Sequence, residues 1–346
     1  MESGRSNIRI AVDAMGGDYA PQNVVEGAFE ALAHGHDFQI VFVGPEPVVV
    51  KAIAANAKSA RYAGRYSIVH AEEIIDMHDS ATASIRKKKE SSIAIGVTLQ
   101  KEERAEAFVS AGHTGAVMSA STLILGRIRG VSRPTIGTFF PCEQGVCLIF
   151  DAGANVDCKP QHLYEFGVMG SIYAREMQGF ASPTVGLLSI GEEETKGNDV
   201  VKEAHQLLKA SRLNFIGNIE GRDILRGKAQ VIVCDGFVGN VILKFGESVP
   251  AFFKSAVRQT VKKSFVAMMF APMMRGILRN ALKSMDYEEY GGVPVLGVNG
   301  ISIIGHGKST PKAIRNMILK AEEMVRKNIN KRIEEALSDN SAGDAA

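Results

Sequence analysis

The chain has 346 residues, of which 45% are hydrophobic and 23% are charged. This length can bury a substantial core, and a prior of ~150 residues per domain suggests two lobes, which one polypeptide can still interweave. The 40 Lys and Arg residues nearly balance the 38 Asp and Glu residues, so net charge gives no argument for a nucleic-acid partner.

The four cysteines, Cys142, Cys147, Cys158 and Cys234, lack the spacing of a zinc site. Residues 1–7 lack the apolar run of a signal peptide, so we expect reduced thiols in a cytoplasmic protein. No run of ~18 apolar residues occurs, which excludes a membrane-spanning helix but leaves contact with a membrane surface open.

Short apolar runs alternate with longer helical patterns along the chain. Such runs between helices are typical of a parallel sheet covered on both faces, which predicts the α/β class. Ligands of such sheets bind beyond the carboxyl ends of the strands. We expect one unit over residues 1–337 and a disordered tail over 338–346. The expected strands are Ile8–Val12, Ile40–Val43, Ala107–Ser110, Val146–Phe150, Thr184–Ile190, Asn214–Gly217 and Val231–Cys234.

The first strand leads into a glycine turn at Asp13–Asp18, and a helical pattern begins near Val24. Gly16 and Gly17 can direct backbone N–H groups into a concavity, where the helix start adds partial positive charge. This predicts a phosphate site, although a tight strand-to-helix turn explains the same residues.

A second glycine turn, Ser110–Gly115, follows the third expected strand. Gly112 and Gly115 permit close backbone approach, and Thr114 supplies a hydroxyl at a helix start. His113 can titrate near neutral pH, but a lone histidine is more often a structural hydrogen-bonding residue than a general base.

Two further polar turns follow expected strands, at Asp151–Asn155 and at Asp235–Asn240. In each turn an amide, from Asn155 or Asn240, can orient a substrate oxygen. Capping of the next helix is an equally good explanation of the two aspartates.

Between these turns lies a charged segment, Gly191–Asn198, in which Lys196 precedes Gly197 after three acidic residues. Its lysine can neutralise a phosphate or the oxyanion of an acyl-transfer intermediate. A solvated charge run is the ordinary interpretation, but the position directly after an apolar strand favours a site.

Several common motifs are absent. Gly307-Lys308-Ser309 resembles the end of a P-loop, but Ser302 replaces the required glycine, which argues against ATP binding. A G-x-S-x-G elbow, an H-E-x-x-H pair and a full dinucleotide fingerprint are also missing. Cys142 and Cys147 just before a strand favour buried structural thiols. We therefore expect no cofactor, no metal and no covalent intermediate.

The segment Lys262–Lys283 predicts a protruding helical hairpin, near 262–285, at a membrane surface. Its unbroken apolar run is too short to span a bilayer, and basic residues flank it. A Met-rich helix pair in the core or a dimer interface is an equal alternative. The expected membrane contacts are Phe265, Met268, Met269, Phe270, Met273 and Met274.

Six ordered motifs over roughly Ile8–Lys327 resemble the bacterial acyl-carrier-protein:phosphate acyltransferases. The motifs are Ile10–Asp18, Ser110–Gly115, Asp151–Asp157 with Lys159-Pro160, Phe215–Asn218, Asp235–Asn240 and Tyr290–Gly292. The resemblance implies a three-layer α/β/α fold like isocitrate and isopropylmalate dehydrogenases and phosphotransacetylases. His113 departs from the family, which commonly has asparagine there.

The resemblance also implies a homodimer that transfers a fatty acyl group reversibly from acyl carrier protein to inorganic phosphate, for a membrane glycerol-3-phosphate acyltransferase. It assigns catalysis to Lys196 and Asn240. Three alternatives stay open: a phosphotransacetylase-like enzyme that uses coenzyme A thioesters, a weaker dehydrogenase interpretation, and a module that binds carrier protein and membrane without turnover.

Overall fold

The computed structural model describes residues 8–34, 37–263, 276 and 291–341. Within these residues one mixed sheet contains eleven strands in the order β3-β2-β1-β4-β11-β10-β5-β6-β9-β7-β8. The strands are β1 (Ile8–Asp13), β2 (Phe38–Gly44), β3 (Tyr66–His70), β4 (Ala107–Ser110), β5 (Thr135–Cys142), β6 (Gly145–Phe150), β7 (Thr184–Leu188), β8 (Asn214–Ile219), β9 (Val231–Val233), β10 (Val293–Leu296) and β11 (Ile301–Ile304).

Helices cover both faces of this sheet. Along β1, Ile10 and Val12 belong to one buried cluster with Phe29 of α1, whereas Ala11 belongs to a second cluster with Val97 of α4. This alternation follows the two-residue period of a strand. The helices are α1 (Gln22–Ala33), α2 (Glu46–Ala55), α3 (Ala81–Lys87), α4 (Ser92–Lys101), α5 (Thr114–Ala120), α6 (Pro160–Gln178), α7 (Asp199–Ala210), α8 (Gly221–Arg226), α9 (Gly236–Lys262), α11 (Pro311–Arg326) and α12 (Ile329–Ser341), with short helical turns at Ser59–Tyr62 and Ser121–Leu125.

The predicted α/β class with a largely parallel sheet is confirmed, and each of the seven expected strands overlaps a real one. Four strands were missed, namely β3, β5, β10 and β11. β5 and β10 contain Pro141 and Pro294, which weaken a strand pattern. These two strands supply the antiparallel pairs, since β10 pairs antiparallel with β11 and β5, and β5 with β6.

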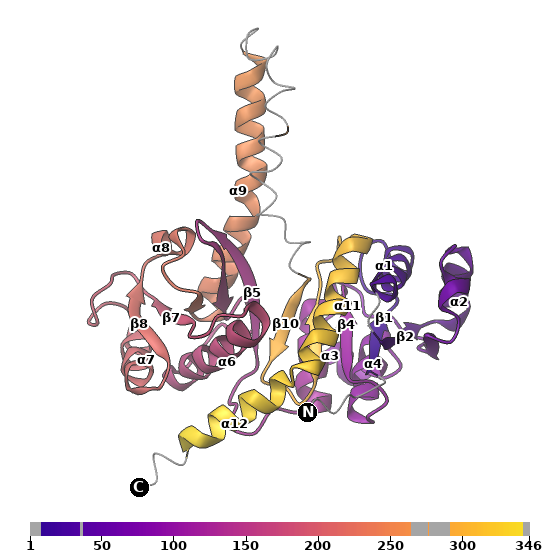
Figure 1. Ribbon diagram of the computed structural model, residues 1–346, viewed down its shortest axis with the longest axis horizontal. Helices are drawn as coiled ribbons and strands as arrows, with labels where there is room; N and C mark the ends of the chain where they lie inside the picture. Colours follow the sequence, from indigo (N-terminus) through magenta and orange to yellow (C-terminus); the bar gives the residue numbers. More distant parts are fainter. Residues whose placement is uncertain (1–7, 35–36, 264–275, 277–290, 342–346) are drawn as a thin grey trace.

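Two lobes lie side by side in Figure 1, and the described strands run from the first lobe to the second and back to the first. Strands β1 to β4 form the first lobe, β5 to β9 form the second, and β10, β11 and α11 return to the first. Because β10 pairs with both β5 and β11, one sheet joins the lobes. The polypeptide therefore interweaves them.

The carboxyl-terminal helix α12 extends into the segment for which the sequence predicted a disordered tail. Ile329, Ile333 and Leu337 are buried at four-residue spacing, which places them on one helical face against the core. The helix continues to Ser341, so Ser338–Ser341 is helical where the sequence predicted disorder.

A long helix, α9, projects from the second lobe (Figure 1). It begins at Gly236 and spans 27 residues, so Lys262, the expected start of a hairpin, is its last residue. The six expected membrane contacts, from Phe265 to Met274, lie outside the described residues. Cys142 and Cys147 also need correction: they lie inside β5 and β6 rather than before a strand, although Cys147 is buried as expected.

Candidate functional site

The first-lobe turns close around a buried carboxylate. Asp13, at the end of β1, accepts hydrogen bonds from Ser110 Oγ at 2.7 Å and from Met15 N at 3.1 Å. Burial raises the pKa of Asp13 despite these bonds. A Cβ on Gly16 would lie 2.9 Å from Gly112 N, so only glycine lets the two turns touch.

Two of the expected anion donors are used inside these turns. Gly16 N–H donates to Asp13 O at 3.3 Å, and Gly112 N–H donates to Ser110 Oγ at 3.0 Å. The two glycines line a small cavity of about 180 Å³ together with Asp13 and Gly17. The N–H groups of Gly16 and Gly112 therefore stabilise the turns themselves. They are not free to donate to a ligand in this cavity.

His113 is the N-cap residue of α5. Its Nδ1 accepts from Ala116 N at 3.2 Å, and its Nε2 lies 3.0 Å from Asp79 O. An accepting Nδ1 assigns the proton to Nε2, which then donates to Asp79 O. Both ring nitrogens thus have backbone partners, which supports the structural interpretation. Gly115 also packs closely here, because a Cβ on it would lie 2.9 Å from Ala81 Cβ.

The second-lobe turns close around Asp151, at the end of β6. This buried carboxylate accepts from the backbone N–H groups of Ile136, Gly153, Ala154 and Asn155 and from the Asn155 amide, at 2.6 to 3.3 Å. Burial raises its pKa even so. The Asn155 amide also donates to Pro134 O at 2.8 Å. Its amide nitrogen is therefore committed to holding the turn.

Two glycines bring α9 against this turn. A Cβ on Gly239 would lie 1.8 Å from Asp151 O, and one on Gly236 would lie 2.7 Å from Asn155 O. Asp235 caps the helix by accepting from Val238 N at 2.8 Å, as the capping alternative predicts. One turn further, Asn240 is exposed, and its amide has no hydrogen-bond partner among the described residues.

Asn240 opens into a cavity of about 460 Å³ between the lobes, which we call the interlobe cleft. Its second-lobe wall includes Thr138, Phe139, Gly153, Asn240, Leu243 and Lys244. Its first-lobe wall includes Gly112, Thr114, His306, Gly307, Lys308 and Ser309. Asp18 also lines the cleft, which thus combines residues of all four predicted strand-end turns with a fifth turn, Gly305–Ser309, that the sequence did not predict.

The missed turn follows β11 and is fixed by local bonds. Gly307 O accepts from Asp18 N at 2.6 Å, and His306 Nδ1 accepts from Lys308 N at 3.1 Å. Lys308 is exposed, and its ammonium has no side-chain partner among the residues that the structure describes. A glycine turn directly after a strand is the signal that identifies the other turns. The same signal is present here, although the segment fails the P-loop pattern.

Lys196 lies elsewhere, in the exposed loop after β7. Its backbone N–H donates to Glu193 O at 3.0 Å, and Gly197 takes a φ of 102° that favours glycine. Lys196 and Gly197 do not line the interlobe cleft. In this structure Lys196 therefore does not share the cleft that Asn240 lines.

Other kinds of site find no support in the part of the chain that the structure describes. No group of three or more His, Cys, Asp or Glu residues there could hold a metal ion. None of its helices is both long enough and apolar enough to cross a membrane.

Two solved structures illustrate the likeness in fold. A phosphotransacetylase from Streptococcus pyogenes superposes with a TM-score of 0.63 and 18% identity, covering 93% of this chain and 94% of that one. A branched-chain phosphotransacylase from Enterococcus faecalis V583 gives a TM-score of 0.57 and 13% identity, with 92% and 99% coverage. At these identities the likeness establishes the fold alone, and it agrees with the predicted architecture.

Sequence relatives are much closer. The phosphate acyltransferase of Heliobacterium modesticaldum is 50% identical over 95% of this chain and 97% of its own length. That of Pelotomaculum thermopropionicum is 48% identical over 92% of each chain. The fatty acid synthesis protein family matches residues 8–332. This chain therefore belongs to that family, whose curated relatives are phosphate acyltransferases, and it is an acyltransferase enzyme.

Proposed function

We propose that the enzyme transfers a fatty acyl group from the thioester of acyl carrier protein to inorganic phosphate, which gives an acyl phosphate. The observation that supports this proposal most is the interlobe cleft. It places the unpaired amide of Asn240 on one wall, and the hydroxyl of Thr114 and the ammonium of Lys308 on the other. An amide, a hydroxyl and a cation suit a thioester oxygen and a phosphate.

The reaction needs positioning more than covalent help, because a thioester is activated and phosphate dianion is a nucleophile. Holding the two reactants together removes the entropic cost of their encounter. We assign Asn240 to the thioester oxygen, where negative charge develops, and Lys308 with Thr114 to phosphate. In the transfer, a phosphate oxygen forms a bond to the acyl carbon, the carbon–sulfur bond breaks, and the carrier thiol leaves.

Lys196 keeps its proposed catalytic role on the strength of the family resemblance. Its exposed loop follows β7, the neighbour of β9, and β9 leads into the turn that carries Asn240. Like Lys308, it has an ammonium without a side-chain partner among the described residues. We propose that this charge stabilises the oxyanion once substrate is bound.

The proposed partners are acyl carrier protein, a second copy of the chain, and a membrane glycerol-3-phosphate acyltransferase that consumes the product. Six large apolar side chains of α9 are exposed to different degrees, which supports a further contact along this helix. Among them Phe237 is 61%, Phe245 is 71% and Phe252 is 75% exposed. Large exposed apolar surface commonly marks such contacts.

We also propose that the apolar segment after α9 contacts an anionic membrane surface in a cytoplasmic enzyme. The support is its sequence and the projection of α9, which ends just before it (Figure 1). Co-sedimentation with anionic vesicles tests this. The double variant M269E/M273E should lose binding yet stay folded and active on soluble substrate; unfolding or loss of a dimer would instead make the segment structural.

A comparison of two acyl donors tests the proposed reaction. The purified enzyme is given acyl carrier protein thioester or coenzyme A thioester with the same acyl group, with and without inorganic phosphate. We expect phosphate-dependent release of thiol from the carrier thioester. Preference for coenzyme A thioester would indicate a phosphotransacetylase-like activity, and binding of carrier without release would indicate a non-catalytic module.

A further inference from the structure

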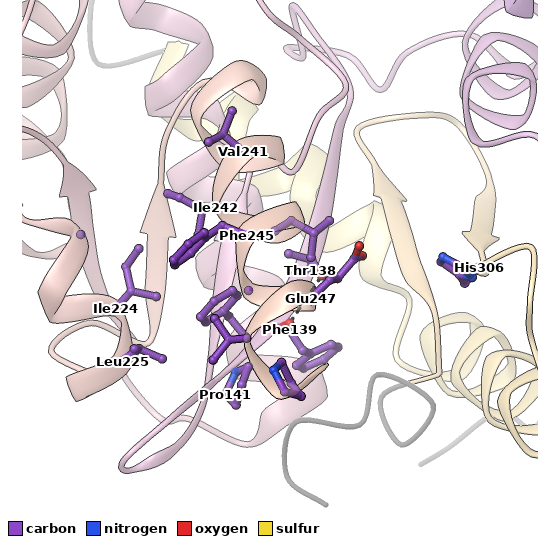
Figure 2. A pocket seen from close by; sticks show the side chains of 16 residues that line it. Thr138, Phe139, Pro141, Ile224, Leu225, Val241, Ile242, Phe245, Glu247 and His306 are labelled. Atoms are coloured by element: carbon purple, nitrogen blue, oxygen red, sulfur yellow. Dashed lines mark hydrogen bonds between the residues drawn. The ribbon is translucent and has the colours of Figure 1, made fainter. Parts of the chain in front are cut away.

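A second cavity, of about 790 Å³, lies beside α9 in the second lobe, and we call it the apolar cavity. Ligand pockets for small molecules span ~300–1,000 Å³ and are mostly apolar, so this volume suits a sizeable ligand. Figure 2 shows side chains from three elements that face it: Phe139 and Pro141 of β5, Ile224 and Leu225 of α8, and Phe245 of α9. The groups that the proposed reaction uses, Asn240, Thr114 and Lys308, do not line this cavity.

The apolar cavity adjoins the interlobe cleft. Thr138, Phe139, Leu243, Glu247 and His306 line both spaces. Figure 2 shows Ile224 and Leu225 on one side of α9, with Thr138 and Glu247 on the side that faces His306. A ligand with a polar end at Asn240 can therefore continue into apolar surroundings.

The helical period of α9 explains how one helix serves both spaces. Asn240, Leu243, Lys244 and Glu247 follow the spacing i, i+3, i+4, i+7 and line the cleft. Ile242, Phe245, Gly246 and Val249 repeat that spacing on another side and line the apolar cavity.

Gly246 makes the close packing beside β5 possible. A Cβ there would lie 2.5 Å from the Phe140 ring, so glycine lets α9 approach β5 along this wall. A larger residue at position 246 would clash with the Phe140 ring and displace the helix.

We infer that the apolar cavity binds the hydrocarbon chain of the acyl substrate, a straight fatty acyl chain whose thioester end lies at Asn240. This inference rests on the proposed function. Each buried CH₂ group contributes ~0.8 kcal/mol, so a long chain gains far more from this cavity than a short one. The cavity therefore sets the preference for chain length.

The absence of tryptophan from the sequence provides a direct test. Leu225 lines the apolar cavity and is 53% exposed, so the variant L225W places a single fluorophore at its wall and narrows it. The matched control L207W carries its fluorophore on α7, where Leu207 is 38% exposed and does not line the cavity. The probe is a long-chain fatty acid brominated near its methyl end, because bromine quenches indole emission on contact.

We expect the probe to quench L225W and not L207W. We also expect kcat/KM of L225W for a sixteen-carbon substrate to fall at least ~10-fold, which corresponds to ~1.4 kcal/mol, with little change for a four-carbon substrate. If L225W is poorly folded, F245W is the second reporter, since an aromatic residue already stands there at 71% exposure.

Three outcomes overturn the inference. Absence of quenching in an enzyme that still turns over long substrates would place the chain elsewhere. Equal losses for short and long substrates would give Leu225 a structural role. An indole that is already shielded from solvent in a dimer, and insensitive to the probe, would make the cavity part of a contact between two copies. Failure of wild-type enzyme to form acyl phosphate from any chain length would instead defeat the proposed function.

Discussion

The two lobes build their turns in the same way but differ in what the turns present. Each lobe buries an aspartate at a strand end, Asp13 after β1 and Asp151 after β6, and burial raises the pKa of both. In each lobe a glycine, Gly16 or Gly239, allows the next turn to touch the first.

The helices that follow the turns make the difference. In the first lobe the cap is His113, whose ring nitrogens both have backbone partners. In the second lobe the cap is Asp235, and the long helix behind it presents Asn240 with an unpaired amide into the cleft. The comparison teaches that buried carboxylates hold the turns, whereas the groups that can act on a ligand are the side chains left without protein partners.

The largest effect should follow loss of such an unpaired group. We expect N240A to lower kcat about 100-fold, or ~2.7 kcal/mol, which is typical for removal of one preorganised oxyanion donor. Circular dichroism should show an intact fold. A near-normal kcat in the folded variant would contradict the role of Asn240.

The two lysines can be separated in the same assay. We expect K196A to lower kcat strongly, by a factor of the same order as N240A. K308A should mainly raise KM for phosphate, because it removes a binding charge. If K308A behaves like wild type, phosphate does not bind at the Gly305–Ser309 turn.

The next largest effect, on the free energy of unfolding, should come from the close packing of α9 against Asp151 in the second lobe. G239A introduces a Cβ 1.8 Å from Asp151 O, so backbone must move, and overpacking of this kind costs ~1–3 kcal/mol of unfolding free energy. Urea unfolding measures it. The control G221A meets nothing within 4 Å and should stay within ~0.5 kcal/mol of wild type. Equal stability of the two variants would show that the turns are not closely packed.

The cap of α9 should contribute less. D235A should lose ~1 kcal/mol, whereas D235N should keep most of the stability, because asparagine caps about as well as aspartate. Full activity of D235N would leave Asp235 with capping alone. A large fall in its kcat, without loss of stability, would instead assign the carboxylate a part in the reaction.

The smallest effect concerns pH. Because burial raises the folded-state pKa of Asp13 above 3.8, the folded protein binds more protons than the unfolded chain between that value and the raised one. The contribution of Asp13 to stability therefore falls as pH rises through this window. Thermal unfolding of wild type and D13N from about pH 4 to about pH 8 measures it. Wild-type stability should fall relative to D13N, and parallel curves would contradict the assignment.

Much of the fold was accessible from the sequence, for physical reasons. Runs such as Ala107–Ser110 are buried on both faces and therefore read as continuous apolar strands. The sequence did not predict β10, because this strand is four residues long and contains Pro294. Its antiparallel pairing with β5 also joins residues that are far apart in the chain.

The site was only partly predictable. Strand-end turns with glycine pointed to Asp13, Gly112 and Asn240, yet the sequence could not show which N–H groups are used internally. It also could not show that Lys308, about 70 residues beyond Asn240, shares a cleft with it. That proximity depends on β11 pairing with β4, a tertiary contact without a local signal.

The most direct test of the central claim is stoichiometry. Purified enzyme, acyl carrier protein thioester and radiolabelled phosphate are incubated, and carrier thiol and labelled acyl phosphate are both counted. The account predicts one labelled acyl phosphate for each thiol released, and no release without phosphate. Thiol release that does not require phosphate, or that leaves the label entirely in inorganic phosphate, would contradict it.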